Sequence, residues 1–196
     1  MPQFKDKINL PDKLASGEVI ILELGSGTRH RDNRVHIDIS DLPETDVIAD
    51  LEQGLPFLPD SSIDAIHATS FLEHIKNLEF LMTEIYRVLK PNGHLYAFTP
   101  HFSNPYYYSD YTHIRPFGLY AFSYFSKSHY PFRRKVPKFY NNCNFRISKI
   151  KLIFRSRLLT KIINSRHRFQ EWYEYYFSHF LPCYGIDVEL TAVKND

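Results

Sequence analysis

Short apolar runs, separated by turn-forming residues, dominate the first hundred positions of the chain. Each run has the length of a buried strand. The strands predicted in this way are residues 19–24, 35–39, 46–49, 63–68 and 94–98. Continuous apolar runs of this kind are typical of parallel strands that are covered on both faces.

The apolar spacing changes to three and four between the last two of these runs. Residues 78–89 carry this helical spacing, and Pro91-Asn92-Gly93 follows as a stop signal. Strands that alternate with helical segments predict an α/β fold with a mostly parallel sheet.

The second half of the chain has a different pattern of apolar and aromatic positions. Residues 145–154 and 185–193 alternate as two further strands, and residues 157–181 have the spacing of one helical segment. Residues 101–144 resemble loops and are rich in Tyr, Phe, Ser and Pro. At 196 residues the chain suits one domain, residues 1–196, with an aromatic lid from 101–144 and 157–181.

Charge divides the chain at the same place. Residues 1–100 hold 9 Lys+Arg against 16 Asp+Glu, whereas residues 101–196 hold 15 against 6. Most of the Phe and Tyr residues also follow position 100. An acidic scaffold is therefore followed by a basic, aromatic surface that suits an anionic or ring-bearing partner.

Compartment and membrane signals are few. The two cysteines, Cys143 and Cys183, cannot build a disulfide framework, so we expect free thiols and a cytoplasmic location. No run approaches 18 apolar residues, which predicts no transmembrane segment.

Polar and small residues gather at the ends of the predicted parallel strands, where ligands of such sheets bind. Gly25 and Gly27 allow a sharp turn close to a ligand, and Asp38 ends the next strand, where a carboxylate can accept both hydroxyls of a ribose. Asp50 and Leu51, one strand further on, suit an adenine. Taken singly, each of these residues also fits a plain turn or helix cap, and so does Glu73-His74 at a helix start.

A dinucleotide site fits less well. That fingerprint needs Gly-x-Gly-x-x-Gly, but His30 stands at the last glycine position. The position before it, where a third glycine is common in related motifs, holds Arg29.

The ordered set of motifs over about residues 19–100 resembles class I S-adenosylmethionine-dependent methyltransferases. Residues 21–27 resemble the first motif of that family and residues 36–40 its acidic second-strand motif. The further matching segments are residues 49–51, 55–57, 62–66, 70–75 and 84–95. The short span from Gly25 to Val35 is similar to a subgroup with a trimmed first helix.

This resemblance implies a Rossmann-like, seven-stranded sheet with an antiparallel last strand, and S-adenosylmethionine as cofactor. It also implies the cofactor contacts. Glu23, Gly25, Ser26 and Gly27 would hold the methionine part, Asp38 with its neighbour Ile39 the ribose, Asp50 and Leu51 the adenine, and Ser70 the region near the sulfonium.

Methyl transfer to a hydroxyl needs a base that takes the proton, and the segment after the fifth strand offers three candidate groups. We predict His113 as the base with Asp110 orienting it, and His101 as the second choice. The alternative is a turn at Asp110 with His113 packed under the tyrosines. The spacing of these three residues matches no metal motif, so no metal is expected.

Substrate contacts are predicted from the same segment: Tyr107, Tyr111 and Arg115, the last as a partner for an anionic group. Asn104-Pro105-Tyr106 resembles the Asn-Pro-Pro-Tyr motif of amine methyltransferases, but it lacks one Pro and comes a strand too late. We therefore interpret it as a loop.

The sequence thus predicts methyl transfer to a small-molecule or carbohydrate acceptor at oxygen. A nucleic-acid methyltransferase that uses the basic aromatic half, and a binding module that has lost the chemistry, are the alternatives. Residues 157–181 are expected to pack on the sheet with a charged face outward; contact with a membrane surface or a second copy stays open.

Overall fold

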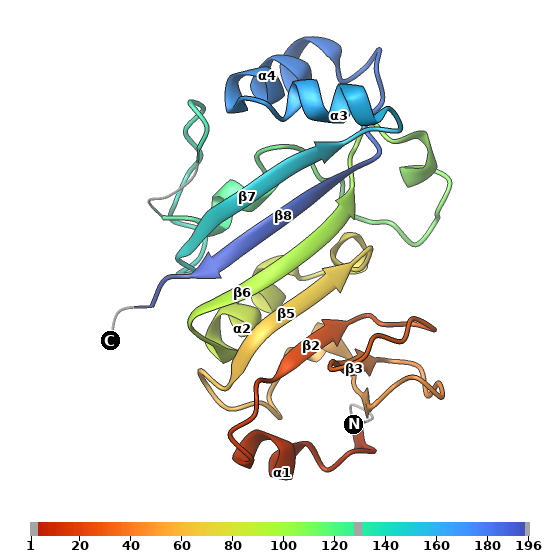
Figure 1. Cartoon of the computed structure of the whole chain (residues 1–196), viewed down its shortest axis with the longest axis vertical. Coiled ribbons are helices and arrows are strands. Elements are labelled where there is room, and N and C mark those ends of the chain that lie inside the picture. The colour runs from red at the N-terminus through yellow and green to blue at the C-terminus, as the bar shows by residue number, and fades with distance from the viewer. Residues whose placement is uncertain (1–3, 128–130, 195–196) are drawn as a thin grey trace.

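The computed structural model describes residues 4–127 and 131–194 and is built around one eight-stranded sheet (Figure 1). The strand order is β1-β4-β3-β2-β5-β6-β8-β7. The bounds are β1 Lys5–Asp6, β2 Ile21–Leu24, β3 Val35–Asp38, β4 Val47–Ile48, β5 Ile63–Thr69, β6 Leu89–Pro100, β7 Phe145–Ile153 and β8 Gly185–Ala192.

Strands β4, β3, β2, β5 and β6 are parallel, and β8 runs antiparallel to both of its neighbours, β6 and β7. The predicted seven-stranded sheet with a reversed last strand is confirmed. The sequence missed β1, which pairs antiparallel with β4, because two residues are too few to show a period.

The helices are α1 Leu10–Ala15, α2 Leu78–Val88, α3 Arg157–Ile163 and α4 His167–Trp172. Helix α2 begins where Asn77 accepts a hydrogen bond from the Phe80 amide, at 3.2 Å, and it buries its whole apolar stripe. Short 3-10 turns occur at Leu51–Gln53, Leu72–His74, Pro105–Tyr107 and Ala121–Phe125.

The crossover from β2 to β3 contains no helix. Residues 25–34 form turns only, so the trimmed first helix that the family resemblance implied is absent altogether. A crossover between parallel strands normally takes a dozen residues or more, and this span is shorter.

The prediction of one helical segment over residues 157–181 is wrong. Arg166 is extended and separates α3 from α4, and a π-helical turn, Tyr173–Phe177, follows α4. The Asn164 side chain pairs with both backbone groups of Leu152 in β7, at 2.8 and 2.7 Å, and so holds the chain at the break. Helix α3 has no fully buried residue, but its partly buried Leu159 and Ile163 pack against the core as expected, and Gln170 and Tyr173 further along are buried.

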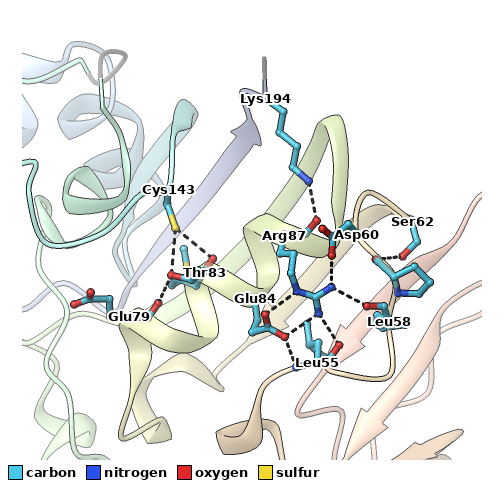
Figure 2. A network of polar contacts seen from close by, with 12 residues as sticks. Leu55, Leu58, Asp60, Ser62, Glu79, Thr83, Glu84, Arg87, Cys143 and Lys194 are labelled. Carbon is cyan, nitrogen blue, oxygen red and sulfur yellow. Dashed lines mark hydrogen bonds and ion pairs between the residues drawn. The ribbon is translucent and has the colours of Figure 1, made fainter. Parts of the chain in front are cut away.

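A polar network ties α2 to the loop that precedes β5 (Figure 2). The Arg87 guanidinium pairs with both oxygens of Glu84, at 2.7 and 2.8 Å, and donates to the Leu55 and Leu58 carbonyls, each at 2.9 Å. Hydrogen bonding to Arg87 holds the pKa of Glu84 below its usual value. One cation therefore satisfies several partly buried acceptors at once.

Both cysteines are free and buried, as predicted. In the described part of the chain, no helix has both the length and the apolar character that crossing a membrane requires.

Replacing Arg87 by Ala should lower the free energy of unfolding by about 2 kcal/mol, because Glu84 and two carbonyls lose a charged donor. Glu84 contributes stability above its unfolded pKa, and this contribution is lost as the pH falls through its lowered folded pKa, so the defect should shrink in acid. Urea titrations at pH 7 and pH 3 measure both effects. Lys149→Ala, which removes an exposed 3.9 Å ion pair to Asp187, is the control and should change stability little. A urea midpoint of Arg87→Ala equal to that of this control would contradict the stabilising role of Arg87.

Candidate functional site

A cavity of about 350 Å³ lies at the carboxyl ends of β2, β3, β4 and β5, and is called the first cavity below. Parallel α/β sheets place their ligands at this edge. Its lining residues are Gly25, Asp38, Ile39, Ala49, Asp50, Leu51, Glu52, Ser70, Phe71, His74 and Ile75. Six of the nine predicted cofactor contacts, Gly25, Asp38, Ile39, Asp50, Leu51 and Ser70, are therefore brought together.

Asp38 is held in place by backbone groups. One carboxylate oxygen accepts from the Gly27 amide and the other from the Ser40 amide, both at 2.9 Å. Each oxygen keeps lone-pair capacity beyond that one bond. Two neighbouring hydroxyls can therefore be bound by one oriented carboxylate.

Asp50 caps the short turn that follows β4, since its Oδ1 accepts from the Glu52 amide at 3.0 Å. The capping explanation of this residue is therefore correct, and Asp50 also lines the first cavity beside the buried Leu51. An acceptor next to an apolar wall suits a flat heterocycle with an amino group.

Gly25 stands where a side chain would not fit. Its φ is +61°, and a Cβ atom would lie 2.2 Å from Cδ2 of Phe71, which lines the same cavity. The glycine thus permits both the turn after β2 and the close approach of the Phe71 ring.

Glu23, Ser26 and Gly27 do not line the first cavity. Glu23 is fully buried and pairs with Arg34, and its other oxygen accepts from the Thr69 hydroxyl at 3.4 Å. Ser26 is buried as well, and its hydroxyl has no partner among the described residues. These residues support the wall of the cavity rather than face its interior.

Arg29 lies in the helix-free segment after β2 and hydrogen-bonds to backbone carbonyls there. Its guanidinium donates to the carbonyls of Gly25 and Thr69, at 3.0 and 2.7 Å, and its Nε donates to Ser26 at 3.3 Å. The residue that stands in place of the family's third glycine thus links the ends of β2 and β5.

Ser70 joins the first cavity to a second one of about 410 Å³, because it lines both. Its φ is +50°, a left-handed conformation that is uncommon for serine, and its amide donates to the Phe98 carbonyl at 2.8 Å. The second cavity is lined by Ser70, Glu73, Phe98, Pro100, Asn104, Tyr106, Tyr107, His113, Arg155 and Tyr184.

His113 faces the second cavity with one ring nitrogen committed to the backbone. Nδ1 lies 2.9 Å from the Tyr107 carbonyl, which can only accept, so in the neutral ring Nδ1 carries the proton and Nε2 has the lone pair. The ring also stacks on Tyr107, with centroids 5.1 Å apart. The alternative of a histidine packed against the tyrosines is therefore observed, and this packing leaves the role of His113 as a base a prediction.

Glu73, which the sequence pattern indicated only as part of a helix start, belongs to this site. Its side chain is fully buried, lines the second cavity, and has no hydrogen-bond partner for either oxygen among the described residues. One oxygen lies 4.0 Å from Nε2 of His113, and burial raises the pKa of Glu73 to about 7. Its place in a Glu-His pair at a strand end was the available signal.

The other predicted catalytic residues are placed differently. Asp110 is exposed and lies 3.5 Å from Nε2 of His113, so the Tyr107 carbonyl, not Asp110, orients the ring through Nδ1. His101 is buried and lines neither cavity, because its two nitrogens contact Glu174, at 2.9 Å, and Ser103, at 2.8 Å.

Of the predicted substrate contacts, only Tyr107 lines the second cavity. Tyr111 is 95% exposed, and Arg115 donates to the Lys76 carbonyl at 2.9 Å, away from the cavity. Asn104, Tyr106, Arg155 and Tyr184 line it instead. Arg155 and Tyr184 flank β7 and β8, so the strand-end rule alone could have indicated them.

A group with metal-binding character also lies here. One ligand atom each of Glu73, His74 and His113 fall within 4.8 Å of one another. These residues could hold a divalent cation, a set different from the His101, Asp110 and His113 combination that the spacing disfavoured.

Comparison with known proteins agrees with this geometry. Residues 22–97 match the family model described as a methyltransferase domain. No curated protein sequence matches the chain.

Solved structures match over nearly the whole chain. A SAM-dependent methyltransferase from Archaeoglobus fulgidus has 16% identity and a TM-score of 0.58, with 93% of this chain and 90% of that chain covered. The YcgJ protein of Bacillus subtilis has 13% identity and a TM-score of 0.54, with 95% and 98% covered. Phosphoethanolamine N-methyltransferase 2 of Haemonchus contortus, solved in complex with S-adenosyl-L-methionine, has 13% identity and a TM-score of 0.51, with 95% and 52% covered.

The matched motifs, the strand order and the structural neighbours agree with one another. Residues 22–97 match the methyltransferase-domain family, and the chain has the Rossmann-like fold seen in S-adenosylmethionine-dependent methyltransferases.

Proposed function

We propose that this protein transfers a methyl group from S-adenosylmethionine to a hydroxyl oxygen of a small-molecule or carbohydrate acceptor. The observation that carries the proposal is the meeting of two cavities at Ser70. One cavity has the residues for a nucleoside, and the other presents a basic nitrogen.

The first cavity fits the adenosyl part of the cofactor. Asp38 offers two oriented oxygens for the ribose hydroxyls, and Asp50 beside Leu51 offers an acceptor for the adenine amino group. The neighbouring Ser70 would contact the region near the sulfonium. The family match over residues 22–97 supports the same cofactor.

S-adenosylmethionine, when bound, supplies a methyl group on a sulfonium, which an acceptor oxygen takes by in-line displacement. The chain's own residues would hold the acceptor in the second cavity and remove the hydroxyl proton. His113 is suited to this task because its Nε2 lone pair faces the cavity while Nδ1 is fixed by the Tyr107 carbonyl. Glu73, 4.0 Å from Nε2, would stabilise the protonated ring.

Aromatic faces in the second cavity favour a ring-shaped acceptor. Tyr106, Tyr107 and Tyr184 line it, and such faces stack well on sugar rings. A cytoplasmic location is part of this proposal, since two buried free thiols suit a reducing compartment.

Titration calorimetry with S-adenosylmethionine, S-adenosylhomocysteine and NAD tests the cofactor. Transfer of a labelled methyl group to sugars, nucleotide sugars or an oligonucleotide then tests the acceptor class. Binding of the adenosyl compounds alone, with label on a sugar, is the expected result. Label on the oligonucleotide would favour the nucleic-acid alternative, and cofactor binding without any transfer would favour an inactive module.

Replacing Asp38 by Ala should weaken S-adenosylmethionine binding by about 1–3 kcal/mol, because two ribose hydroxyls lose a charged acceptor. Calorimetry measures the change. Asp41→Ala is a matched control three residues away, since Asp41 is exposed and pairs only with Lys5 and Lys7. Equal affinities of the two variants would remove the ribose assignment.

Replacing His113 by Ala should leave cofactor affinity unchanged and slow turnover by about 10²–10⁴-fold, the usual contribution of a general base. Single-turnover transfer at saturating cofactor measures the rate. His179→Ala, at an exposed position, should retain the activity of the natural chain. A fully active His113→Ala variant would exclude this residue as the base.

Glu73 makes the stability depend on pH. Its folded pKa, about 7, lies above the ordinary value of 4.5, so its contribution is fully present below pH 4.5 and is lost as the pH rises through 7. Glu73→Gln, which stays neutral, should therefore flatten the fall in unfolding free energy between pH 4.5 and pH 8. Urea titrations over this range measure the slope, with the exposed Glu79→Gln as control; a slope unchanged by Glu73→Gln would contradict burial of this carboxyl.

A further inference from the structure

A third cavity, of about 420 Å³, continues from the second one. The two cavities share the lining residues Asn104, Tyr106, Arg155 and Tyr184, so they lie side by side. The far wall of the third cavity is apolar and includes Phe154, Leu159, Leu181 and Pro182. Nothing in the proposed methyl transfer accounts for this extension.

Arg155 stands at the junction of the two cavities. It follows the carboxyl end of β7, and its guanidinium lies 5.7 Å from the centre of the Tyr106 ring and 3.2 Å from the Tyr106 hydroxyl. The ion pairs found among the described residues do not include Arg155. The Arg155 guanidinium is thus positioned by the Tyr106 ring, and no carboxylate of those ion pairs neutralises its charge. Its remaining N–H groups can donate to an anion.

The chain around Arg155 carries positive charge only. Residues 155–168 contain Arg155, Arg157, Lys161, Arg166 and Arg168 and no acidic residue. Clustered charge of one sign raises the local concentration of an oppositely charged ligand and its rate of association. An anionic ligand is therefore favoured at this edge of the sheet.

We propose that the acceptor is an amphiphilic anion that spans both cavities. Its reacting hydroxyl would lie in the second cavity, a phosphate or phosphodiester group would bind Arg155, and an apolar chain would fill the third cavity. This inference rests on the proposed function and narrows its acceptor from small molecules and carbohydrates in general to those linked through a phosphate to an apolar chain.

The combination of charge and apolar wall excludes simpler ligands. A free phosphate would use Arg155 but leave Leu159 and Leu181 in water, whereas an uncharged hydrocarbon would cover the wall and leave the exposed guanidinium without a counter-charge. A ligand that carries both groups satisfies both requirements at once.

Calorimetric titration with octyl phosphate below its micelle concentration tests the assignment, with inorganic phosphate and octyl glucoside as the two partial ligands. Octyl phosphate should bind at least tenfold more tightly than either. Affinity for octyl phosphate no greater than for inorganic phosphate would overturn the apolar half of the proposal. Affinity no greater than for octyl glucoside would overturn the anionic half.

Variants separate the two contacts. Arg155→Gln should weaken octyl phosphate binding about tenfold, Arg155→Lys should weaken it less, and the exposed neighbour Arg157→Gln should leave it unchanged. Leu159→Ser should weaken octyl phosphate while leaving inorganic phosphate unaffected. Equal effects of Arg155→Gln and Arg157→Gln would overturn the assignment of Arg155.

Titration with S-adenosylmethionine in each variant distinguishes the two proposals and serves as a folding control. Unchanged cofactor affinity in Arg155→Gln shows that the fold is intact. Loss of cofactor affinity in this variant would overturn the assignment of the cofactor and the anion to different cavities. If the natural chain binds octyl phosphate as expected but no S-adenosylmethionine, the proposed function fails while the amphiphile site stands.

Discussion

The short return from β2 to β3 is the constraint on which the site depends. With no helix between these strands, the peptide groups at their ends have no helical packing above them, and a buried carbonyl without a donor is costly. The Arg29 guanidinium meets this requirement for three carbonyls, of Gly25, Ser26 and Thr69. One side chain thus links the ends of two parallel strands and sets the position of the turn at Gly25.

The rest of the site follows from that turn. Gly27 comes near enough to Asp38 to donate to its carboxylate, and Phe71 packs where Gly25 leaves space. Ser70, which lies between the end of β5 and Phe71, then lines both cavities. The first and second cavities consequently share one wall, which is the arrangement that the proposed transfer between two bound molecules requires.

The sheet was predictable because buried parallel strands are short, apolar and separated by turn residues. The gathering of six predicted cofactor residues around one cavity was predictable for a related reason, since strand ends place them together. Glu23 and Ser26 carry motif positions but face inward, which a motif alone does not reveal. Side-chain direction in the irregular segment 101–117 has no period, so the sequence could not show that Tyr111 and Arg115, predicted as substrate contacts, lie outside the lining of the second cavity.

The break between α3 and α4 was hidden for a different reason. Residues 157–181 keep a helical spacing of apolar positions, and only the pairing of Asn164 with Leu152 shows that the chain stops and restarts there. A contact between residues that are separated in the sequence does not show in the local spacing of apolar positions. Glu73 was similarly hidden, since burial without a partner is a property of its surroundings.

That side-chain pairing has a consequence for how the molecule behaves in a crowded solution. β7 is the last strand of the sheet, and an open strand edge invites pairing with other chains. The Asn164 amide takes both backbone groups of Leu152, and Gln170 donates to the Ile150 carbonyl at 2.9 Å. Side chains thereby occupy the positions that a foreign strand would need, so the protein protects its own edge against aggregation.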